Sequence, residues 1–251
     1  MLGVKSMNRK SILKREHKNK DYNIITLQNP NGSISECYRR IKVGIKFSSI
    51  NRKVQVIEVT SPNQNDGKTI TLLNLAATFI EDKKKVLIID MDLRRPKIHH
   101  AFKSKNENGL DDYLVGDIPL SKLVKHSSSP YIDYIVRGSK VPYPLTVLDD
   151  PSIKKLIDSF RDQYDYILLD CPPILAVSDA LIIATYADAA LFIVSQMFCN
   201  KNDAILAMKY LKDNDVPILG VVFTNVTKKN SNYSHDYNYY SYKKRYYGDK
   251  K

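Results

Sequence analysis

Hydrophobic residues in this chain fall into short continuous runs that alternate with longer, periodically spaced segments. The short runs are rich in β-branched and aromatic residues and predict strands over 54–60, 86–90, 131–137, 164–170, 189–195 and 217–224. Several are apolar throughout, as is typical of strands buried on both faces of a parallel sheet. The segments before and between them predict helices over 33–50, 69–82, 119–126, 151–162, 178–186 and 201–213.

This alternation predicts an α/β fold, a doubly wound and mostly parallel sheet with right-handed crossovers. Ser178–Asp179 and Asn200–Lys201 supply polar residues that suit the starts of two of the helices. Because ligands of such sheets bind outside the carboxyl ends of the strands, we expect the functional residues at those ends.

Charge is distributed unevenly along the 251 residues. The net charge is +12, of which residues 1–20 contribute seven Lys/Arg and one Glu, and residues 228–251 seven Lys/Arg and two Asp. Basic ends suit an acidic partner such as anionic lipid, although solvated tails are an equal alternative. Residues 1–32 are expected to be a basic flexible segment, and 228–251, which lack Leu, Ile, Val and Phe, a disordered tail.

Targeting and metal-binding signals are weak in this sequence. The basic N-terminus has no apolar core that would make it a secretory signal, and the apolar stretch 174–194 is interrupted by Asp179 and Asp188. Three cysteines without ligand spacing indicate reduced thiols rather than a metal site. These features predict a protein without a membrane span of its own.

The segment TSPNQNDGKT, residues 60–69, resembles a phosphate-binding loop between a buried strand and a helix. Pro62 stands at the usual first glycine, and Asn65 is a residue that tolerates positive φ. Lys68 is expected to reach the β- and γ-phosphates, and the Thr69 hydroxyl to coordinate Mg²⁺. The nucleotide-binding residues predicted here are Asn65, Asp66, Gly67, Lys68, Thr69 and Ile70.

Three aspartates follow two other predicted strands. Asp90 and Asp92 end VLIIDMD, and Asp170 ends YILLD, the position of a Walker B carboxylate. Strand ends of a parallel sheet share one edge, so we expect all three near Lys68. The alternative for any one of them is a solvated strand-end aspartate.

The run Asp90-Met91-Asp92-Leu93-Arg94 resembles the Walker A′ motif of bacterial tyrosine kinases, specifically the cytoplasmic BY-kinases of Gram-positive capsule and exopolysaccharide systems. The segments LDCPP, NGLDDYLVGD and LGVV are also similar to that family. The resemblance implies that residues 33–227 form a P-loop kinase domain, related in fold to ParA and MinD ATPases, that uses ATP and Mg²⁺.

Residue roles follow from the resemblance. Lys68 and Thr69 would bind ATP-Mg²⁺, Asp92 and Asp170 would organise the metal, and Asp90 would deprotonate the incoming tyrosine. Arg94 would add positive charge near the phosphates, or else neutralise the aspartates as a surface residue. Asn225, after the last strand, is the candidate for adenine recognition.

The family also implies partners. Glu36, Arg39 and Lys42 resemble its E-x-x-R-x-x-R helix motif, which docks on a neighbouring subunit and closes a homo-oligomeric ring; intrahelical charge pairs are the alternative. A transmembrane adaptor of the polysaccharide co-polymerase type would activate the kinase and hold it, as a peripheral cytoplasmic protein, at the inner face of the plasma membrane. A protein-tyrosine phosphatase would reverse the reaction, and nucleic acid is not expected as a partner.

Seven of the 17 tyrosines lie in the C-terminal tail. A segment without aliphatic residues has no packing use for them, so a phosphoacceptor cluster is the favoured interpretation. The expected acceptors, phosphorylated in trans by a neighbouring subunit, are Tyr233, Tyr237, Tyr239, Tyr240, Tyr242, Tyr246 and Tyr247.

Two other functions fit parts of the sequence. A ParA/MinD-like ATPase that positions DNA or protein would share the fold, but it would carry a signature lysine near Asn63. A nucleotide-binding scaffold with a degenerate loop would bind ATP without either activity.

Overall fold

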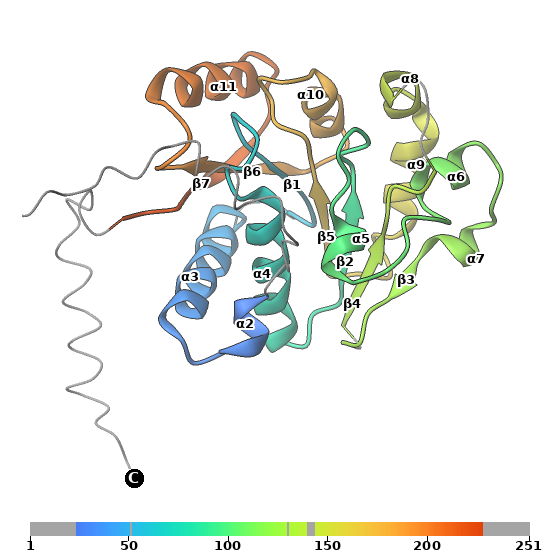
Figure 1. Cartoon of the computed structure of the whole chain (residues 1–251), viewed down its shortest axis with the longest axis horizontal. Coiled ribbons are helices and arrows are strands. Elements are labelled where there is room, and N and C mark those ends of the chain that lie inside the picture. Colours follow the sequence, from blue (N-terminus) through green and yellow to red (C-terminus); the bar gives the residue numbers. More distant parts are fainter. Residues whose placement is uncertain (1–23, 51, 130, 140–143, 228–251) are drawn as a thin grey trace, which may run out of the picture.

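The computed structural model of the chain describes residues 24–50, 52–129, 131–139 and 144–227. In these residues one seven-stranded sheet lies between two layers of helices (Figure 1). The strands are β1 (Val56–Thr60), β2 (Val86–Asp90), β3 (Lys125–His126), β4 (Ile132–Ile135), β5 (Tyr166–Asp170), β6 (Ala189–Ser195) and β7 (Ile218–Thr224). The helices are α2 (Ile25–Gln28), α3 (Ser33–Ser48), α4 (Lys68–Glu81), α5 (Ile98–Ala101), α6 (Leu110–Leu114), α7 (Leu120–Leu123), α8 (Pro144–Leu148), α9 (Pro151–Ser159), α10 (Asp179–Ala184) and α11 (Lys201–Asp213).

The strand order is β3-β4-β2-β5-β1-β6-β7, and every neighbouring pair is parallel except β3 with β4. This confirms the predicted mostly parallel α/β sheet. The register pairs Asp90 directly with Asp170, so the ends of β2 and β5 lie side by side. The strand ends that were expected to carry the chemistry therefore meet at one edge.

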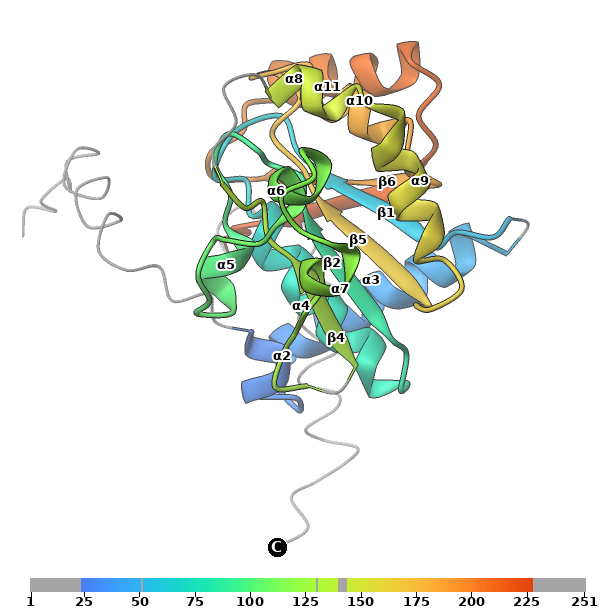
Figure 2. The same ribbon diagram turned by 90° about the vertical axis from the view of Figure 1, so that its right-hand side faces the viewer.

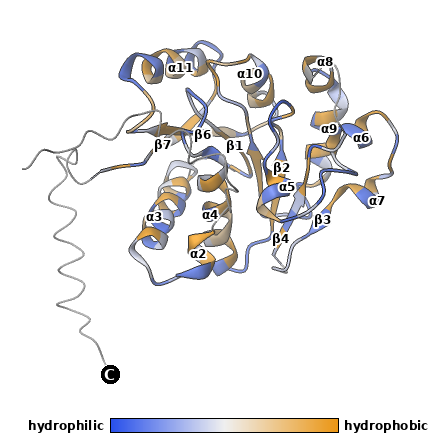
Figure 3. Ribbon diagram, in the orientation of Figure 1, coloured by the Kyte–Doolittle hydropathy of each residue, from blue (hydrophilic) through white to orange (hydrophobic). Residues whose placement is uncertain are grey.

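Each face of the sheet has its own core. Helices α2 to α5 cover one face (Figure 2). Leu72 and Phe79 of α4 belong to the same core cluster there as Ile57 and Val59 of β1. Helices α6 to α11 cover the other face. Figure 3 shows the strands as mostly hydrophobic and the helices as hydrophobic on the side toward the sheet. This burial accounts for the continuous apolar runs of the central strands.

The prediction differs from the structure at one edge of the sheet and at the N-terminus. The helix expected over 119–126 is wrong at its end, because α7 stops at Leu123 and Lys125–His126 pair with β4 as the antiparallel edge strand β3. At the N-terminus, Thr26 of α2 is buried and bonds through its amide and hydroxyl to Asn74 Oδ1 of α4, at 3.0 and 2.9 Å. Residues 24–32, assigned to the flexible segment 1–32, thus pack on the domain. Residues 1–23 and 228–251 lie outside the described residues, and the rest of that division stays a prediction.

Candidate active site

The loop between β1 and α4 has the backbone geometry of an anion cradle. Asn65 (φ 65°) and Gly67 (φ 95°) both have positive φ, and Gly67 immediately precedes the first residue of α4. Asp66 stabilises the turn by accepting a 2.8 Å hydrogen bond from the Asn63 amide at Oδ2, while its carbonyl accepts a 2.6 Å bond from the Thr224 hydroxyl. The loop thus aims the N-terminal amides of a 14-residue helix at the edge of the sheet.

Lys68 and Thr69, in the first turn of α4, point into this edge. Both side chains are buried; the Lys68 Nζ donates to Ser61 Oγ at 3.2 Å, and the Thr69 hydroxyl donates to Asp170 Oδ2 at 2.8 Å. Burial lowers the pKa of Lys68, and the nearby charges of Asp170, Asp92 and Asp66 oppose that shift. The structure therefore places the predicted phosphate lysine beside the predicted carboxylates.

Asp90 and Asp170 form a buried pair of carboxyl groups at the ends of β2 and β5. Burial raises the pKa of Asp170 to about 6, and burial together with the charge of Asp170 raises the pKa of Asp90 well above its ordinary value. Asp90 Oδ2 accepts the amides of Lys97 and Ile98 at 2.8 and 2.9 Å. In contrast, Asp90 Oδ1 and Asp170 Oδ1 are buried without a hydrogen-bond partner among the residues that the structure describes.

Unpartnered buried oxygens favour a cation at this place, because a carboxylate removed from water needs a donor or a metal. The remaining predicted ligand, Asp92, is also buried and uses Oδ1 to accept the Arg95 amide at 2.9 Å. Within the described ranges no three His, Cys, Asp or Glu side chains form a complete metal cage. Mg²⁺ in a phosphate site takes only one or two protein oxygens besides phosphate and water, so the Thr69–Asp170 pair fits that ion.

Lys97 is a residue that the sequence analysis missed. Its amide bonds to Asp90, and its side-chain charge lowers the pKa of Lys68 and opposes the upward shift in the pKa of Asp170. A lysine three residues beyond Arg94 in the Walker A′ segment was the available signal, but nothing in the pattern indicates that the chain turns back there to begin α5.

Other predicted site residues are held away from the carboxylate pair. Arg94 bonds to the buried Asp179 of α10 through Nε at 2.8 Å and Nη2 at 3.2 Å, which favours the alternative that it neutralises an aspartate. Asn225, with φ 51°, donates from Nδ2 to Ser195 Oγ at 3.0 Å, next to Thr224, which holds the loop. Ile70 lies in the first turn of α4 and is half-buried.

The predicted interface residues bond within their own chain. Arg39 of α3 bonds to Glu81 at 2.6 and 2.8 Å and pairs with Glu36 at 3.3 Å. Lys42 is buried and donates to the Thr78 carbonyl at 2.9 Å, with Asp82 at 3.2 Å. These bonds fasten α3 to the end of α4, and a role in ring assembly stays a prediction. The seven tail tyrosines lie outside the described residues.

Fold and site together define a P-loop nucleotide-binding protein, and comparisons with known proteins agree. The family model "AAA domain" matches residues 54–207. The cell division ATPase MinD of Pyrococcus furiosus superposes with a TM-score of 0.58 over 67% of this chain and 71% of its own, at 24% identity, a likeness that shows the fold alone.

The chain belongs to the bacterial tyrosine-protein kinase family. It is 34% identical to "Tyrosine-protein kinase YwqD" of Bacillus subtilis over 88% of this chain and 92% of that protein. The kinase domain of the Escherichia coli tyrosine kinase ETK superposes with a TM-score of 0.79 at 30% identity, over 86% of this chain and 85% of that one. A "putative tyrosine-protein kinase in cps region" of Klebsiella pneumoniae is 33% identical over 83% of this chain, which spans only 29% of that longer relative.

The predicted family is thus confirmed, while its Gram-positive subtype stays a prediction. None of the described helices is both long and apolar enough to cross a membrane.

Proposed function

We propose that this chain is an ATP-dependent protein-tyrosine kinase that phosphorylates the C-terminal tyrosines of a neighbouring copy and regulates capsular or exopolysaccharide synthesis. The observation that carries the proposal is the buried Asp90–Asp170 pair, with an unpartnered oxygen on each carboxyl group, next to Lys68 and Thr69. The likeness to YwqD and to the ETK kinase domain supports the reaction type, and the cps region named for the Klebsiella relative supports the pathway.

Bound Mg-ATP supplies the transferable phosphoryl group and the charge of the cation. Thr69 Oγ1, Asp170 and Asp92 would hold the cation, and the N-terminal amides of α4 with Lys68 would hold the phosphates. Asp90 would accept the proton of the tyrosine hydroxyl at Oδ1 as the phenol oxygen bonds to the γ-phosphorus and ADP leaves. A phenol has a pKa of about 10, so a carboxyl group of raised pKa is the better proton acceptor.

Further roles at the site rest on the same proposal. Asn225 would contact adenine once its bond to Ser195 is exchanged, while Asn65, Asp66, Gly67 and Ile70 would shape the phosphate loop. Arg94 would act indirectly, by fixing the Walker A′ segment to Asp179. Lys97 would add a second positive charge near the phosphates.

Assembly and location are proposed on the family likeness. The chain would form a ring of identical subunits, bind a transmembrane adaptor at the inner face of the plasma membrane, and be reset by a protein-tyrosine phosphatase. The basic ends would add contacts with anionic lipid.

The test incubates purified full chain with Mg-ATP, with and without an adaptor tail peptide, and measures phosphotyrosine and ADP together. The wild-type chain is expected to form phosphotyrosine, and Lys68→Ala to lose both signals. Asp90→Asn should still bind nucleotide but lose phosphotyrosine by about 10²-fold or more, as expected for removal of a general base. ADP release without phosphotyrosine in the wild type would instead establish a MinD-like ATPase.

A further inference from the structure

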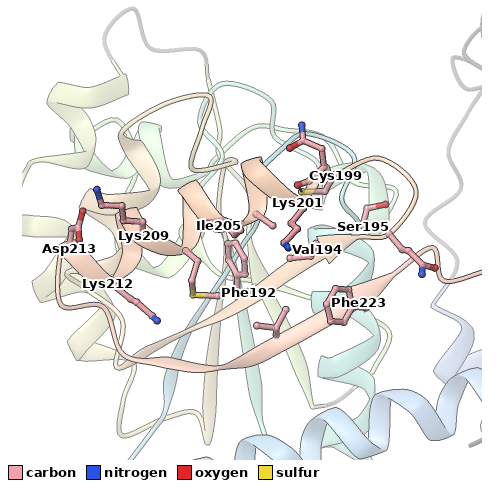
Figure 4. Close-up of a pocket in the computed structure, with 15 residues that line it drawn as sticks. Phe192, Val194, Ser195, Cys199, Lys201, Ile205, Lys209, Lys212, Asp213 and Phe223 are labelled. Carbon is pink, nitrogen blue, oxygen red and sulfur yellow. Dashed lines mark hydrogen bonds between the residues drawn. The ribbon is translucent and has the colours of Figure 1, made fainter. Parts of the chain in front are cut away.

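A largely apolar groove of about 780 Å³ lies between α11 and the last two strands of the sheet (Figure 4). Its floor is apolar and comes from three elements: Phe192 and Val194 of β6, Ile205 and Met208 of α11, and Phe223 of β7. Phe223 and Ile205 are 65% and 57% exposed, although both are large hydrophobic residues. Exposed apolar side chains gathered around one groove indicate a binding surface.

Lysines line the same groove. Lys201, Lys209 and Lys212, all from α11, are among its lining residues, and Asp213 is the one acidic residue in the lining that the structure describes. Lys201 and Lys212 extend over the space above the strands in Figure 4, whereas Lys209 lies beside Asp213. No ion pair holds Lys201 or Lys212 within the described part of the chain. An apolar floor below two uncompensated ammonium groups suits a ligand that is both aromatic and anionic.

The chain's own tail starts at this groove. The amide of Thr227, the last described residue, donates a 3.0 Å bond to Gln196 Oε1, and Gln196 lines the groove. Residues 231–242, SNYSHDYNYYSY, carry five of the seven tail tyrosines and no Lys or Arg. Tyr233 follows Thr227 by six residues, a span of at most about 20 Å when extended.

We infer that the groove between α11 and β7 binds the phosphorylated form of this chain's own 231–242 segment. The tyrosine ring would lie on the apolar floor, and the phosphate would meet Lys201 and Lys212. The inference rests on the proposed function, because it requires a tail that becomes phosphorylated.

Phosphorylation acts as a switch in this arrangement. The unmodified tail 228–251 has seven Lys/Arg and two Asp, so its charge has the same sign as the groove lysines. Each phosphate adds roughly −1.5 to −2 charges and three strong acceptor oxygens, so about three phosphates offset the tail's net positive charge, and each one gives the groove lysines an anionic partner. A linker of a few residues gives an effective concentration in the millimolar range, so a weak site is occupied within one molecule. A tail bound in this way would be withdrawn from the active site of a neighbouring subunit.

The first test measures binding of a fluorescent 231–242 peptide to the phosphatase-treated full chain without nucleotide. The peptide carries synthetic phosphates on Tyr237 and Tyr239, whose spacing of two residues would place them on one side of the peptide if it binds in an extended form. We expect it to bind about tenfold more tightly than the unphosphorylated peptide, and more tightly than the same peptide with phosphoserine at both positions. Equal binding of the phosphotyrosine and unphosphorylated peptides overturns the inference. If the phosphoserine peptide binds as tightly as the phosphotyrosine peptide, the groove recognises charge alone and not the tyrosine ring, and the inference is also overturned.

Groove variants locate the site. Lys201→Ala combined with Lys212→Ala, and separately Ile205→Asp, should each weaken phosphopeptide binding about tenfold. Lys155→Ala on the exposed side of α9 and Leu206→Asp, on α11 but outside the groove, are the matched controls and should change nothing. Binding that survives both groove variants overturns the inference. The unphosphorylated chain could instead self-associate in a concentration-dependent way. If Ile205→Asp abolishes that association, the groove binds a second copy of the chain, and the inference is overturned.

Hydrogen exchange on the full chain separates this inference from the proposed function. The phosphorylated chain should protect amides of α11 and β7 relative to the phosphatase-treated chain, at a level independent of protein concentration. If phosphotyrosine forms without such protection, the kinase proposal stands and the binding of the tail in the groove is contradicted. If the chain forms no phosphotyrosine, the kinase proposal is contradicted, while the synthetic phosphopeptide still tests whether the groove binds phosphotyrosine.

Discussion

The Thr69 hydroxyl donates a 2.8 Å hydrogen bond to the Asp170 carboxylate and so joins the first turn of α4 to the end of β5. Both groups are buried, and the second oxygen of Asp170 has no partner among the described residues. Replacing the hydroxyl by a methyl group leaves both oxygens of the buried Asp170 carboxylate without a hydrogen-bond donor among the described residues. The contact between Thr69 and Asp170 therefore depends on the hydroxyl group and not on the volume of the side chain.

Thr69→Val should lower the rate of phosphotyrosine formation by about 10²-fold, because it removes a proposed cation ligand and the hydroxyl that donates to the Asp170 carboxylate. Thr69→Ser keeps the hydroxyl and should stay within about threefold of wild type. Rates at saturating ATP and the affinity for Mg²⁺ are the measurements. A Thr69→Val chain as active as Thr69→Ser would remove Thr69 from the metal site.

Gly67 is the residue at which the phosphate loop is most sensitive to a side chain. Its φ of 95° is unfavourable for other residues, and an added Cβ would lie 3.3 Å from the Thr224 side chain. Gly67→Ala should cost about 1–2 kcal/mol of folding free energy and weaken ATP binding more than tenfold.

Gly44 provides the matched control for that variant. It lies within α3 with nothing within 4 Å of an added Cβ, so Gly44→Ala should stabilise the chain by about 0.5–1 kcal/mol. Urea unfolding and nucleotide titration measure both variants. Unchanged ATP affinity in Gly67→Ala would mean that the loop rearranges on binding.

Glu58 is a carboxyl group in the hydrophobic interior, fully buried on β1. Neither of its oxygens has a hydrogen-bond partner within the described residues, and burial raises its pKa from 4.5 to about 8, with partial opposition from the nearby Cys171 thiol. The folded state therefore binds more protons than the unfolded state between these two pH values. Stability is highest below the unfolded pKa and falls as pH rises toward 8.

Glu58→Gln should remove this dependence. Between pH 5 and pH 8 the wild-type chain should lose about 2–4 kcal/mol relative to Glu58→Gln, since each pKa unit corresponds to about 1.4 kcal/mol. The exposed Glu107→Gln is the control and should parallel wild type. Urea unfolding at both pH values measures the free energy of unfolding of each chain. If this free energy changes with pH by the same amount in wild type and in Glu58→Gln, Glu58 is not buried in its charged form at pH 8.

How well the sequence predicted each element depended on its length. Strands 86–90 and 189–195 and helix 201–213 have the predicted bounds, because each buries a continuous or periodic apolar pattern. Helices α2, α5, α6 and α8 have four or five residues, too few to repeat a helical period, and they were missed. β3 was taken for the end of a helix because a two-residue edge strand is defined by its partner β4 and not by its own residues.

The same distinction applies to the site. Gly67, Lys68 and Asp170 were predicted because each stands next to the strand or helix that positions it. The bonds of Arg94 to Asp179, of Arg95 to Gln64 and of Asn225 to Ser195 join residues at least 30 positions apart, and only the folded chain brings them together. Asn65 is an intermediate case: its tolerance of positive φ was predicted from its type, and the structure gives φ 65°.

Lys42 tests whether the α3 motif stabilises the fold or the assembly. Its ammonium group is buried against the Thr78 carbonyl and Asp82, so Lys42→Met keeps the aliphatic stem but removes the side-chain donor to the Thr78 carbonyl and one of the two lysines that pair with Asp82. The cost should be about 1–3 kcal/mol in urea unfolding at fixed protein concentration. Lys46→Met, which removes a more exposed partner of the same Asp82, should cost less than about 1 kcal/mol. If Lys42→Met unfolds like wild type yet loses self-association in light scattering, the lysine acts at a subunit interface, and the bonds to α4 are not what holds α3 in place.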